Sequence, residues 1–208
     1  MLLIRTKHDI QTHYLFNACS PVIKVAETKG LNVIKVEDNV TKENVSKRLA
    51  KIKPKFVFYN GHGTPTAFLN HNKEEVINLE SAKLLKGTIV FARACDSVSV
   101  LGKKAVDEGC KAFVGYKKPF FIVRRHEMES RPLKDQTVAP IIECSNAVAL
   151  ELVNGKSVTQ AVEKSHQLAD QNIVDLIYSG DPYLQAALPA LVHNDAALDY
   201  EGDGKAKI

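Results

Sequence analysis

Short apolar runs alternate along this chain with longer segments in which apolar residues recur at helical spacing. The runs are rich in β-branched and aromatic residues and lack the polar alternation of a half-exposed sheet, which predicts strands buried on both faces. They lie at Leu2–Arg5 and Leu31–Val36, then from Phe56, from Thr88 and at Ala112–Tyr116. This alternation predicts an α/β fold, a three-layer α-β-α sandwich with a mostly parallel sheet and right-handed crossovers.

The segments between the runs carry signals for helices. Thr12–Lys29 has helical periodicity; Gly30 is placed to end this helix and Pro21 to kink or divide it. Thr41 can cap a further helix of about ten residues, and Val98–Asp107 predicts another. Residues 65–79, in contrast, are polar and rich in turn formers.

The pattern changes after the fifth run. Residues 117–136 lose all periodicity and are rich in lysine and arginine; a loop of this length in a compact domain is uncommon unless it is functional or mobile. Helical patterns return at Val138–Val153 and from Ser157 to about Leu176. We expect one domain over residues 1–187, with an edge strand and a frayed C-terminal tail over residues 188–208.

Composition narrows the class of protein. The chain of 208 residues is 45% hydrophobic and carries a net charge of +4, with its lysines spread along the sequence, so nucleic-acid binding is not indicated. Its 4 cysteines are widely spaced, without the paired spacing of a zinc site or the density of a disulfide scaffold. No apolar run is long enough for a signal peptide or a membrane span. We expect a cytoplasmic protein with reduced thiols and without a metal or other cofactor.

Two reactive side chains follow neighbouring apolar runs. His62 lies in the turn Gly61-His62-Gly63 after the run from Phe56, and Cys95 follows the run from Thr88. If these strands are parallel, both side chains lie at the carboxyl edge of the sheet, where α/β proteins bind ligands. A thiol needs a neighbouring base to become a nucleophile, and an imidazole can supply one. Each motif also has a structural interpretation, since a Gly-His-Gly turn can be a plain connection and a cysteine a small buried residue.

These motifs resemble the signature of the caspase-like cysteine peptidases, the group of caspases, clostripain, gingipains, separase and CHAT-domain peptidases. The segment from Gly109 to Gly115 is similar to the strand after the cysteine helix in CHAT-type members, and Gly180-Asp181-Pro182 resembles a late turn of gingipain and CHAT-type domains. The resemblance implies strands in the order 2-1-3-4 near the site and peptide-bond hydrolysis by a Cys95/His62 dyad. It further implies an oxyanion hole formed by the N–H groups of Gly63 and Cys95. No aspartate or asparagine is evident in the sequence as a partner that orients His62.

The substrate pocket is predicted from strand alternation and charge. Arg93 lies two residues before Cys95 and is expected on the same side of the strand. In caspases this position lines the S1 pocket, and a guanidinium here favours an acidic P1 residue; alternatively, Arg93 pairs with Asp96 or covers the sheet edge. Further candidates for substrate binding lie at the same edge: Arg5, Lys7, Tyr116 and Lys117.

Two functions remain open at this stage. The first is an active cysteine endopeptidase, with a protein or peptide substrate and a regulatory protein partner. The second is a catalytically silent caspase-like module that binds a peptide or small ligand at the same edge. The loop at 117–136 is expected to border the groove and to be mobile, and it is either a site of self-cleavage, as in caspases and clostripain, or an ordinary solvated loop.

Overall fold

Six strands form one mixed sheet in the order β2-β1-β3-β6-β7-β8 in the computed structural model, which describes residues 1–208. All neighbours are parallel except β7 and β8, and β4 and β5 form a separate antiparallel hairpin. The strands are β1 (Leu2–Arg5), β2 (Ile34–Val36), β3 (Phe56–Asn60), β4 (Ala67–Leu69), β5 (Glu75–Asn78), β6 (Ile89–Arg93), β7 (Ala112–Tyr116) and β8 (Leu198–Gly202). The expected order of the first four sheet strands is confirmed.

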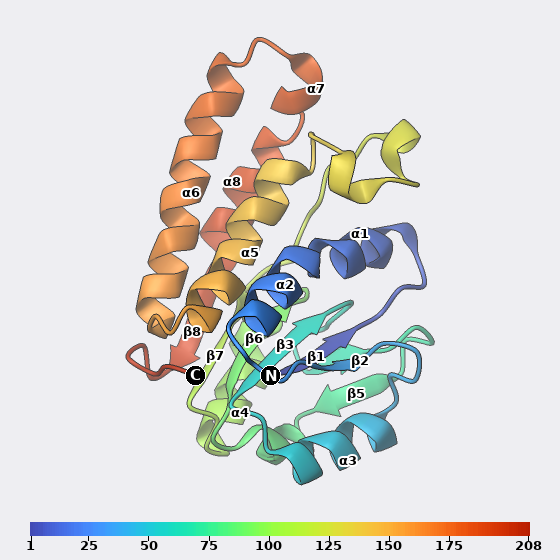
Figure 1. The fold of residues 1–208 in the computed structure, drawn as a ribbon, viewed down its shortest axis with the longest axis vertical. Coiled ribbons are helices and arrows are strands. Elements are labelled where there is room, and N and C mark those ends of the chain that lie inside the picture. The colour runs from blue at the N-terminus through green and yellow to red at the C-terminus, as the bar shows by residue number, and fades with distance from the viewer.

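Helices cover both faces of this sheet (Figure 1). One face packs against α1, α2, α5, α6 and α8, and the other against α3, α4 and the β4–β5 hairpin. The helices are α1 (Ile10–Ala18), α2 (Ser20–Thr28), α3 (Lys42–Ile52), α4 (Lys103–Asp107), α5 (Ala139–Val153), α6 (Val158–Tyr178), α7 (Pro182–Gln185) and α8 (Leu188–Ala197). The three-layer α/β sandwich predicted from the apolar pattern is therefore confirmed. None of these helices combines the length and apolar composition needed to cross a membrane.

Local sequence signals predicted several helix ends correctly. The first helical segment divides at Cys19, with Pro21 in the first turn of α2, and Gly30 follows α2 with φ +76°. The Thr41 side chain accepts a hydrogen bond from Asn44 N–H and caps α3. Asp181, in the Gly180-Asp181-Pro182 turn, caps α7 by accepting from Tyr183 N–H at 2.8 Å.

The C-terminal segment contains the expected edge strand but otherwise differs from its prediction. Residues 188–197 form α8, and β8 then pairs antiparallel with β7 at the sheet edge. The last residues are not frayed, because Val158 N–H donates to Ala206 O at 3.1 Å and Thr159 N–H to Gly204 O at 2.9 Å. The apolar patch that the sequence shows in this segment belongs to the same core as α5 and α6.

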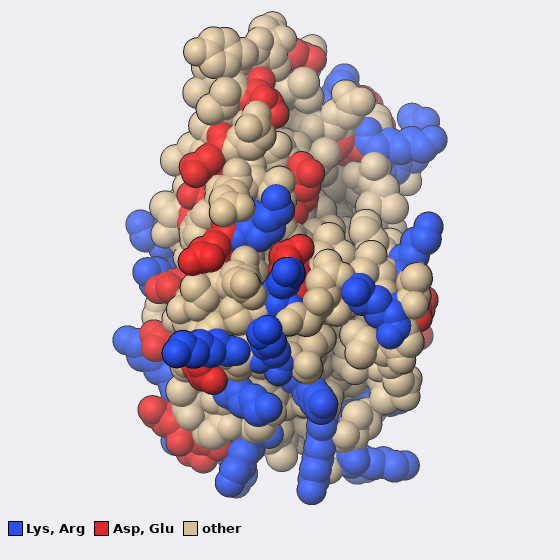
Figure 2. Space-filling model, turned by 60° about the vertical axis from the view of Figure 1, so that its left-hand side comes forward, with Lys and Arg blue, Asp and Glu red and all other residues tan.

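Charged side chains are unevenly distributed on the surface. On the face drawn in Figure 2, acidic side chains follow a line in the upper half, whereas lysines and arginines gather in the lower half. Positive side chains are therefore denser toward one end of this face.

Candidate active site

Cys95 lies in a sharp turn at the carboxyl end of β6. The strand ends at Arg93, and Asp96 has a left-handed backbone with φ +55°, a conformation that is uncommon outside glycine and recurs at functional sites. The Cys95 side chain is partly exposed, whereas the other three cysteines are buried. Burial raises the pKa of the Cys95 thiol, and the hydrogen bond that Sγ accepts from Phe120 N–H at 3.4 Å opposes this shift only in part. The thiol is protonated at rest and needs a base to react.

The Gly-His-Gly turn packs directly against this cysteine turn. β3 and β6 are parallel neighbours with Asn60 opposite Arg93, and Gly61 N–H donates to Arg93 O at 3.3 Å. A Cβ atom on Gly63 would lie 2.9 Å from the Ala94 Cβ and 3.5 Å from the Cys95 nitrogen, so only glycine fits there without a shift. Neither Gly63 N–H nor Cys95 N–H donates a hydrogen bond within the chain. Two free donors therefore lie side by side at the sheet edge.

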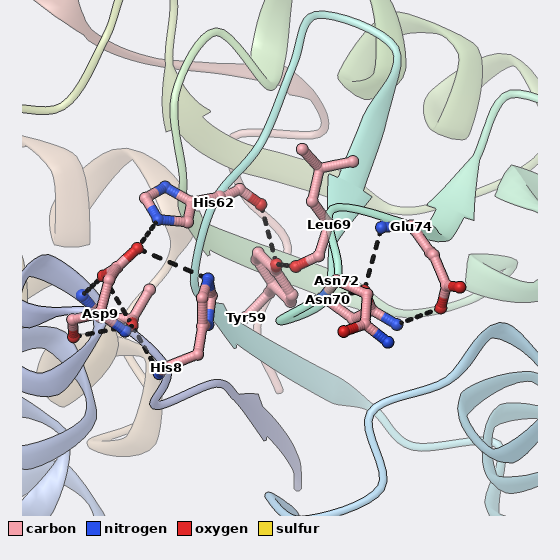
Figure 3. Close-up of polar contacts among 9 residues, drawn as sticks. His8, Asp9, Tyr59, His62, Leu69, Asn70, Asn72 and Glu74 are labelled. Carbon is pink, nitrogen blue, oxygen red and sulfur yellow. Dashed lines mark hydrogen bonds and ion pairs between the residues drawn. The ribbon is translucent and has the colours of Figure 1, made fainter.

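A buried tyrosine fixes the backbone of this turn. The Tyr59 hydroxyl lies 2.8 Å from His62 O and 2.6 Å from Leu69 O, and Leu69 N–H also donates to His62 O at 3.0 Å (Figure 3). The Tyr59 ring is fully buried and stacks on Phe68 with 4.0 Å between the ring centroids. The backbone of His62 is thus held by Tyr59 of the sheet and by Leu69 of the β4–β5 hairpin.

Asp9 orients the His62 ring, a role that the sequence analysis missed. His62 Nε2 lies 2.5 Å from Asp9 Oδ2, and the other carboxylate oxygen accepts from Thr12 N–H at 2.7 Å and from the Thr12 hydroxyl at 2.8 Å (Figure 3). Burial alone would raise the pKa of Asp9, but the hydrogen bonds from His62 and Thr12 outweigh it and lower the pKa to about 2. Asp9 is therefore an anion at neutral pH. The sequence analysis expected no such partner for His62, and the capping box Asp9-x-x-Thr12 after the first strand is the signal that could have revealed it.

His62 and Cys95 occupy neighbouring turns without a hydrogen bond between them. The ring bonds to Asp9 through Nε2, and the thiol bonds to the Phe120 amide. Because Asp9 occupies Nε2, Nδ1 is the ring nitrogen left without a hydrogen bond. Catalytic hydrogen bonds are often long in the absence of substrate.

Arg93 contradicts its predicted role. Its side chain is fully buried, donates from Nε to Ser145 Oγ at 2.9 Å and from a terminal nitrogen to Asn146 Oδ1, and lies over the Phe58 ring. Strand alternation directs it to the face that α5 covers, so it does not contact a substrate. Tyr116 is buried in the same layer and its hydroxyl donates to the same Ser145 Oγ at 2.9 Å, so it too is removed from the surface.

The remaining basic candidates for substrate binding differ in exposure and in ion pairing. Arg5 is buried, pairs with Glu37 at 2.6 Å and donates to Phe16 O, so it holds β1 to its neighbours. Lys117 is ion-paired with Asp199 at 2.8 Å on the edge strand β8. Lys7, just past β1, is exposed and belongs to no ion pair. Of the five expected substrate-binding residues, Lys7 alone is both exposed and free of an ion pair.

The basic loop at 117–136 borders the cysteine, as its position in the sequence predicts. Phe120 N–H reaches Cys95, and Phe121 is bonded through both N–H and C=O to the side chain of Asn194. Asp135, which is buried, accepts from Arg125 N–H and from the Tyr14 hydroxyl. These contacts tie the loop to α1 and α8 at several points, whereas the sequence suggested a loop without fixed partners.

The sheet order, the helices on both faces and the paired turns at the carboxyl ends of β3 and β6 define a caspase-like α/β fold. Among solved structures, this fold is similar to that of gingipain. The crystal structure of the Arg-specific cysteine proteinase gingipain R has a TM-score of 0.65 at 14% sequence identity and covers 100% of this chain and 46% of that chain. The complex of the pro- and mature domains of RgpB from Porphyromonas gingivalis has a TM-score of 0.60 at 14% identity, covering 98% and 47%.

These comparisons establish the fold of the chain and the share of the gingipain structures that it spans. The resemblance to the caspase and gingipain group is confirmed at the level of the fold. This chain spans a little under half the length of the gingipain structures. No family model matches it, and no curated protein matches its sequence.

Proposed function

We propose that this chain is a cysteine endopeptidase. The observation that carries the proposal is the packing of the Gly63 turn on the Cys95 turn, which brings two free backbone N–H donors, a thiol and an aspartate-bound histidine to one sheet edge. Acyl transfer by a thiol uses a nucleophile, a base and donors for the oxyanion, and a group that orients the base supports it further. The gingipain-like fold is consistent with this reaction class.

Each residue has a defined part in the proposed reaction. His62 Nδ1 takes the Cys95 proton, and the sulfur attacks the carbonyl carbon of the scissile peptide bond. Asp9 stabilises the imidazolium that forms and keeps its ring in place. The ring proton then passes to the leaving amine as the C–N bond breaks, which leaves a thioester on Cys95. A water molecule, deprotonated by His62, hydrolyses the thioester and restores the thiol.

The oxyanion is stabilised by the backbone. The N–H groups of Gly63 and Cys95 are proposed to donate to the carbonyl oxygen when it becomes negative. Each such donor is typically worth about 3 kcal/mol of transition-state stabilisation. Because Gly63 has no side chain, a substrate carbonyl can approach both donors closely.

We propose that an exposed lysine near the site sets the P1 preference. The acidic preference expected from Arg93 now depends on Lys7, which lines a cavity of about 440 Å³ together with His8 and the acidic residues Glu37 and Asp38. The similar gingipain R is described as Arg-specific. A positional-scanning peptide library decides between an acidic and an arginine P1 preference. A preference for acidic P1 that is lost in Lys7→Ala supports our proposal, and a preference for P1 Arg contradicts it.

A catalytically silent binding module is the second candidate function. It is favoured by the absence of a hydrogen bond between Cys95 and His62 and by the raised pKa of the Cys95 thiol. A peptidyl electrophile distinguishes the two functions, because it reacts fast only with an activated thiol.

The test combines labelling with turnover. We expect rapid, single-site labelling of Cys95 in the wild-type chain, much slower labelling in His62→Ala, and peptide hydrolysis that Cys95→Ala abolishes. Cys110→Ala is the matched control, since it removes a buried thiol distant from the turn. Slow and equal labelling of all four cysteines, with no hydrolysis of any library peptide, would establish the silent module instead.

A further inference from the structure

Three metal-ligating side chains converge next to the proposed catalytic cysteine. His8 and Asp9 follow β1 and His62 follows β3, and these strands are parallel neighbours in register from Leu2 to Arg5. The ligand atoms of His8, Asp9 and His62 all lie within 4.8 Å of one another. Asp9 Oδ2 lies between the two rings, 2.5 Å from His62 Nε2 and 3.5 Å from His8 Nε2 (Figure 3).

The two contacts of Asp9 are close to the ligand spacing of a small tetrahedral cation. Zinc binds imidazole nitrogen and carboxylate oxygen at about 2.0–2.2 Å, so two of its ligands lie about 3.4 Å apart. The contact of Asp9 with His8 already has this spacing, and the contact with His62 reaches it if the side chains separate by less than about 1 Å. Two imidazoles and one carboxylate leave a fourth position for water, as in zinc sites with three protein ligands.

The surroundings hold these ligands in place. Thr12 occupies Asp9 Oδ1 through its N–H and its hydroxyl, which leaves Oδ2 to face the rings. The Thr12 hydroxyl also accepts from His8 N–H at 3.0 Å, so one residue positions two ligands. The backbone of His62 is fixed by Tyr59 and Leu69. Partners of this kind outside the ligand shell commonly raise metal affinity about 10- to 100-fold.

The side chains are also accessible to an ion from solution. The exposed fractions of the side chains are 19% for His8, 40% for Asp9 and 28% for His62, so an ion can enter without any rearrangement of the core. The mixture of nitrogen and oxygen ligands selects a transition-metal ion over magnesium or calcium, which prefer oxygen alone.

We infer that His8, Asp9 and His62 form a binding site for a divalent transition-metal ion of the Zn²⁺ class, and that the bound ion switches the peptidase off. The ion would bind His62 Nε2 in place of the proton shared with Asp9, so the neutral ring would carry its remaining proton on Nδ1 and could no longer take the Cys95 proton. The regulatory half of this inference rests on the proposed peptidase function. The binding half does not, because it concerns only ligand geometry.

The binding half is tested on the Cys95→Ala chain, in which no thiol at the site can bind metal. Titration of Zn²⁺ against a chromophoric chelator near neutral pH is expected to show one ion per chain, with binding at least about tenfold weaker when His8→Ala is added. Asp9→Ala should weaken it similarly, but it also removes the cap of α1, so His8→Ala, which caps no helix, is the decisive variant. His126→Ala is the matched control, because the His126 side chain is 92% exposed and lies outside the cluster. Absence of stoichiometric binding, or equal affinity in His8→Ala and His126→Ala, would overturn the metal site.

The regulatory half is tested by turnover of the wild-type chain. Stoichiometric Zn²⁺ is expected to inhibit hydrolysis and a metal chelator to restore it. His8→Ala is expected to require at least about tenfold more Zn²⁺ for the same fractional loss of its own zinc-free activity. Hydrolysis that continues with the ion bound would refute the regulatory half. A chain that binds Zn²⁺ but hydrolyses no peptide would refute the proposed function and leave the metal site standing, whereas an active chain without Zn²⁺ binding would refute the metal site alone.

Discussion

Nε2 of the His62 ring lies 2.5 Å from Oδ2 of Asp9, although the two residues are 53 positions apart in the sequence. Asp9 is also the N-cap of α1 and is fixed there by Thr12. The same carboxylate therefore caps a helix through one oxygen and orients an imidazole through the other. The geometry of the proposed base depends on the first crossover of the sheet, where the cap of α1 forms.

Replacing Asp9 with asparagine separates these two roles. An asparagine side chain can still cap the helix, but the negative charge that supports an imidazolium is gone, so we expect Asp9→Asn to lower kcat by about tenfold to hundredfold, a part of the usual contribution of acid–base catalysis. Steady-state hydrolysis of a peptide substrate measures this effect. Asp170→Asn, at an exposed aspartate on α6 that forms no ion pair, is the control. A kcat equal to that of the control would remove Asp9 from the mechanism.

The charge of Asp9 also predicts a pH dependence of stability. Its pKa in the folded chain is about 2, below the ordinary value of 3.8. A carboxylate with a lowered pKa stabilises the fold fully above its unfolded pKa, and this contribution is lost as the pH falls from about 4 toward 2. We expect the difference in unfolding free energy between the wild-type chain and Asp9→Asn to shrink over that range.

The size of this effect is limited by exposure, since 40% of the Asp9 side chain is accessible and solvent screens its interactions. Denaturant unfolding at several pH values measures the difference. If it stays constant between about pH 4 and pH 2, the lowered pKa is not linked to folding.

The sequence predicted the placement of His62 and Cys95 because that placement depends on topology alone. Apolar runs without alternation identify buried parallel strands, and right-handed crossovers bring consecutive carboxyl ends to one edge. The pairing of β3 with β6 follows from these rules and from the resemblance to caspases. The β4–β5 hairpin was not predicted, because its strands are short and lie in a segment rich in turn formers.

The partners of the site residues could not be predicted in the same way. Asp9 reaches His62 only because a helix cap turns its carboxylate back toward β3, and such a contact depends on side-chain direction rather than on strand order. Arg93 was expected on the same side of its strand as Cys95, but the sequence did not reveal that α5 covers the face on which Arg93 lies. Strand alternation specifies the face of the sheet and leaves open what packs on it.

Gly63 offers a direct test of the close packing between the two turns. An alanine here would place its Cβ 2.9 Å from the Ala94 Cβ and 3.0 Å from Cys95 O, closer than ordinary contacts allow. We therefore expect Gly63→Ala to shift the cysteine turn and lower kcat/KM by at least about a hundredfold, the usual effect of losing one oxyanion donor.

Gly155→Ala serves as the control for this substitution. Gly155 has φ +81° with open space around it, so alanine there strains the backbone without touching the site. Its activity should match that of the wild-type chain after correction for the folded fraction. Near-normal activity of Gly63→Ala would show that the oxyanion donors are not at this turn.

Arg93 leads to a prediction about stability in place of specificity. The guanidinium is fully buried without an acidic partner, and one of its terminal nitrogens has no hydrogen-bond partner. Burial lowers the pKa of this group, but an arginine in a protein stays charged. A buried charge that is bonded only to neutral groups is costly, so the volume of this side chain, more than its charge, supports the core.

Two substitutions of Arg93 separate volume from charge. Arg93→Ala leaves a cavity and strips Ser145 and Asn146 of a donor, so it should destabilise the chain by about 3 kcal/mol or more. Arg93→Met fills most of the space without a charge to bury, so it should cost less than the alanine change, in line with buried ion pairs that apolar residues replace at little loss. Urea unfolding midpoints rank the stability of the wild type, Arg93→Ala and Arg93→Met.

A positional-scanning peptide library on the stable methionine variant measures P1 preference. Because Arg93 lies beneath α5 and not in the groove, we expect the P1 profile of Arg93→Met to match the wild type; a changed profile at unchanged stability would return Arg93 to the substrate pocket.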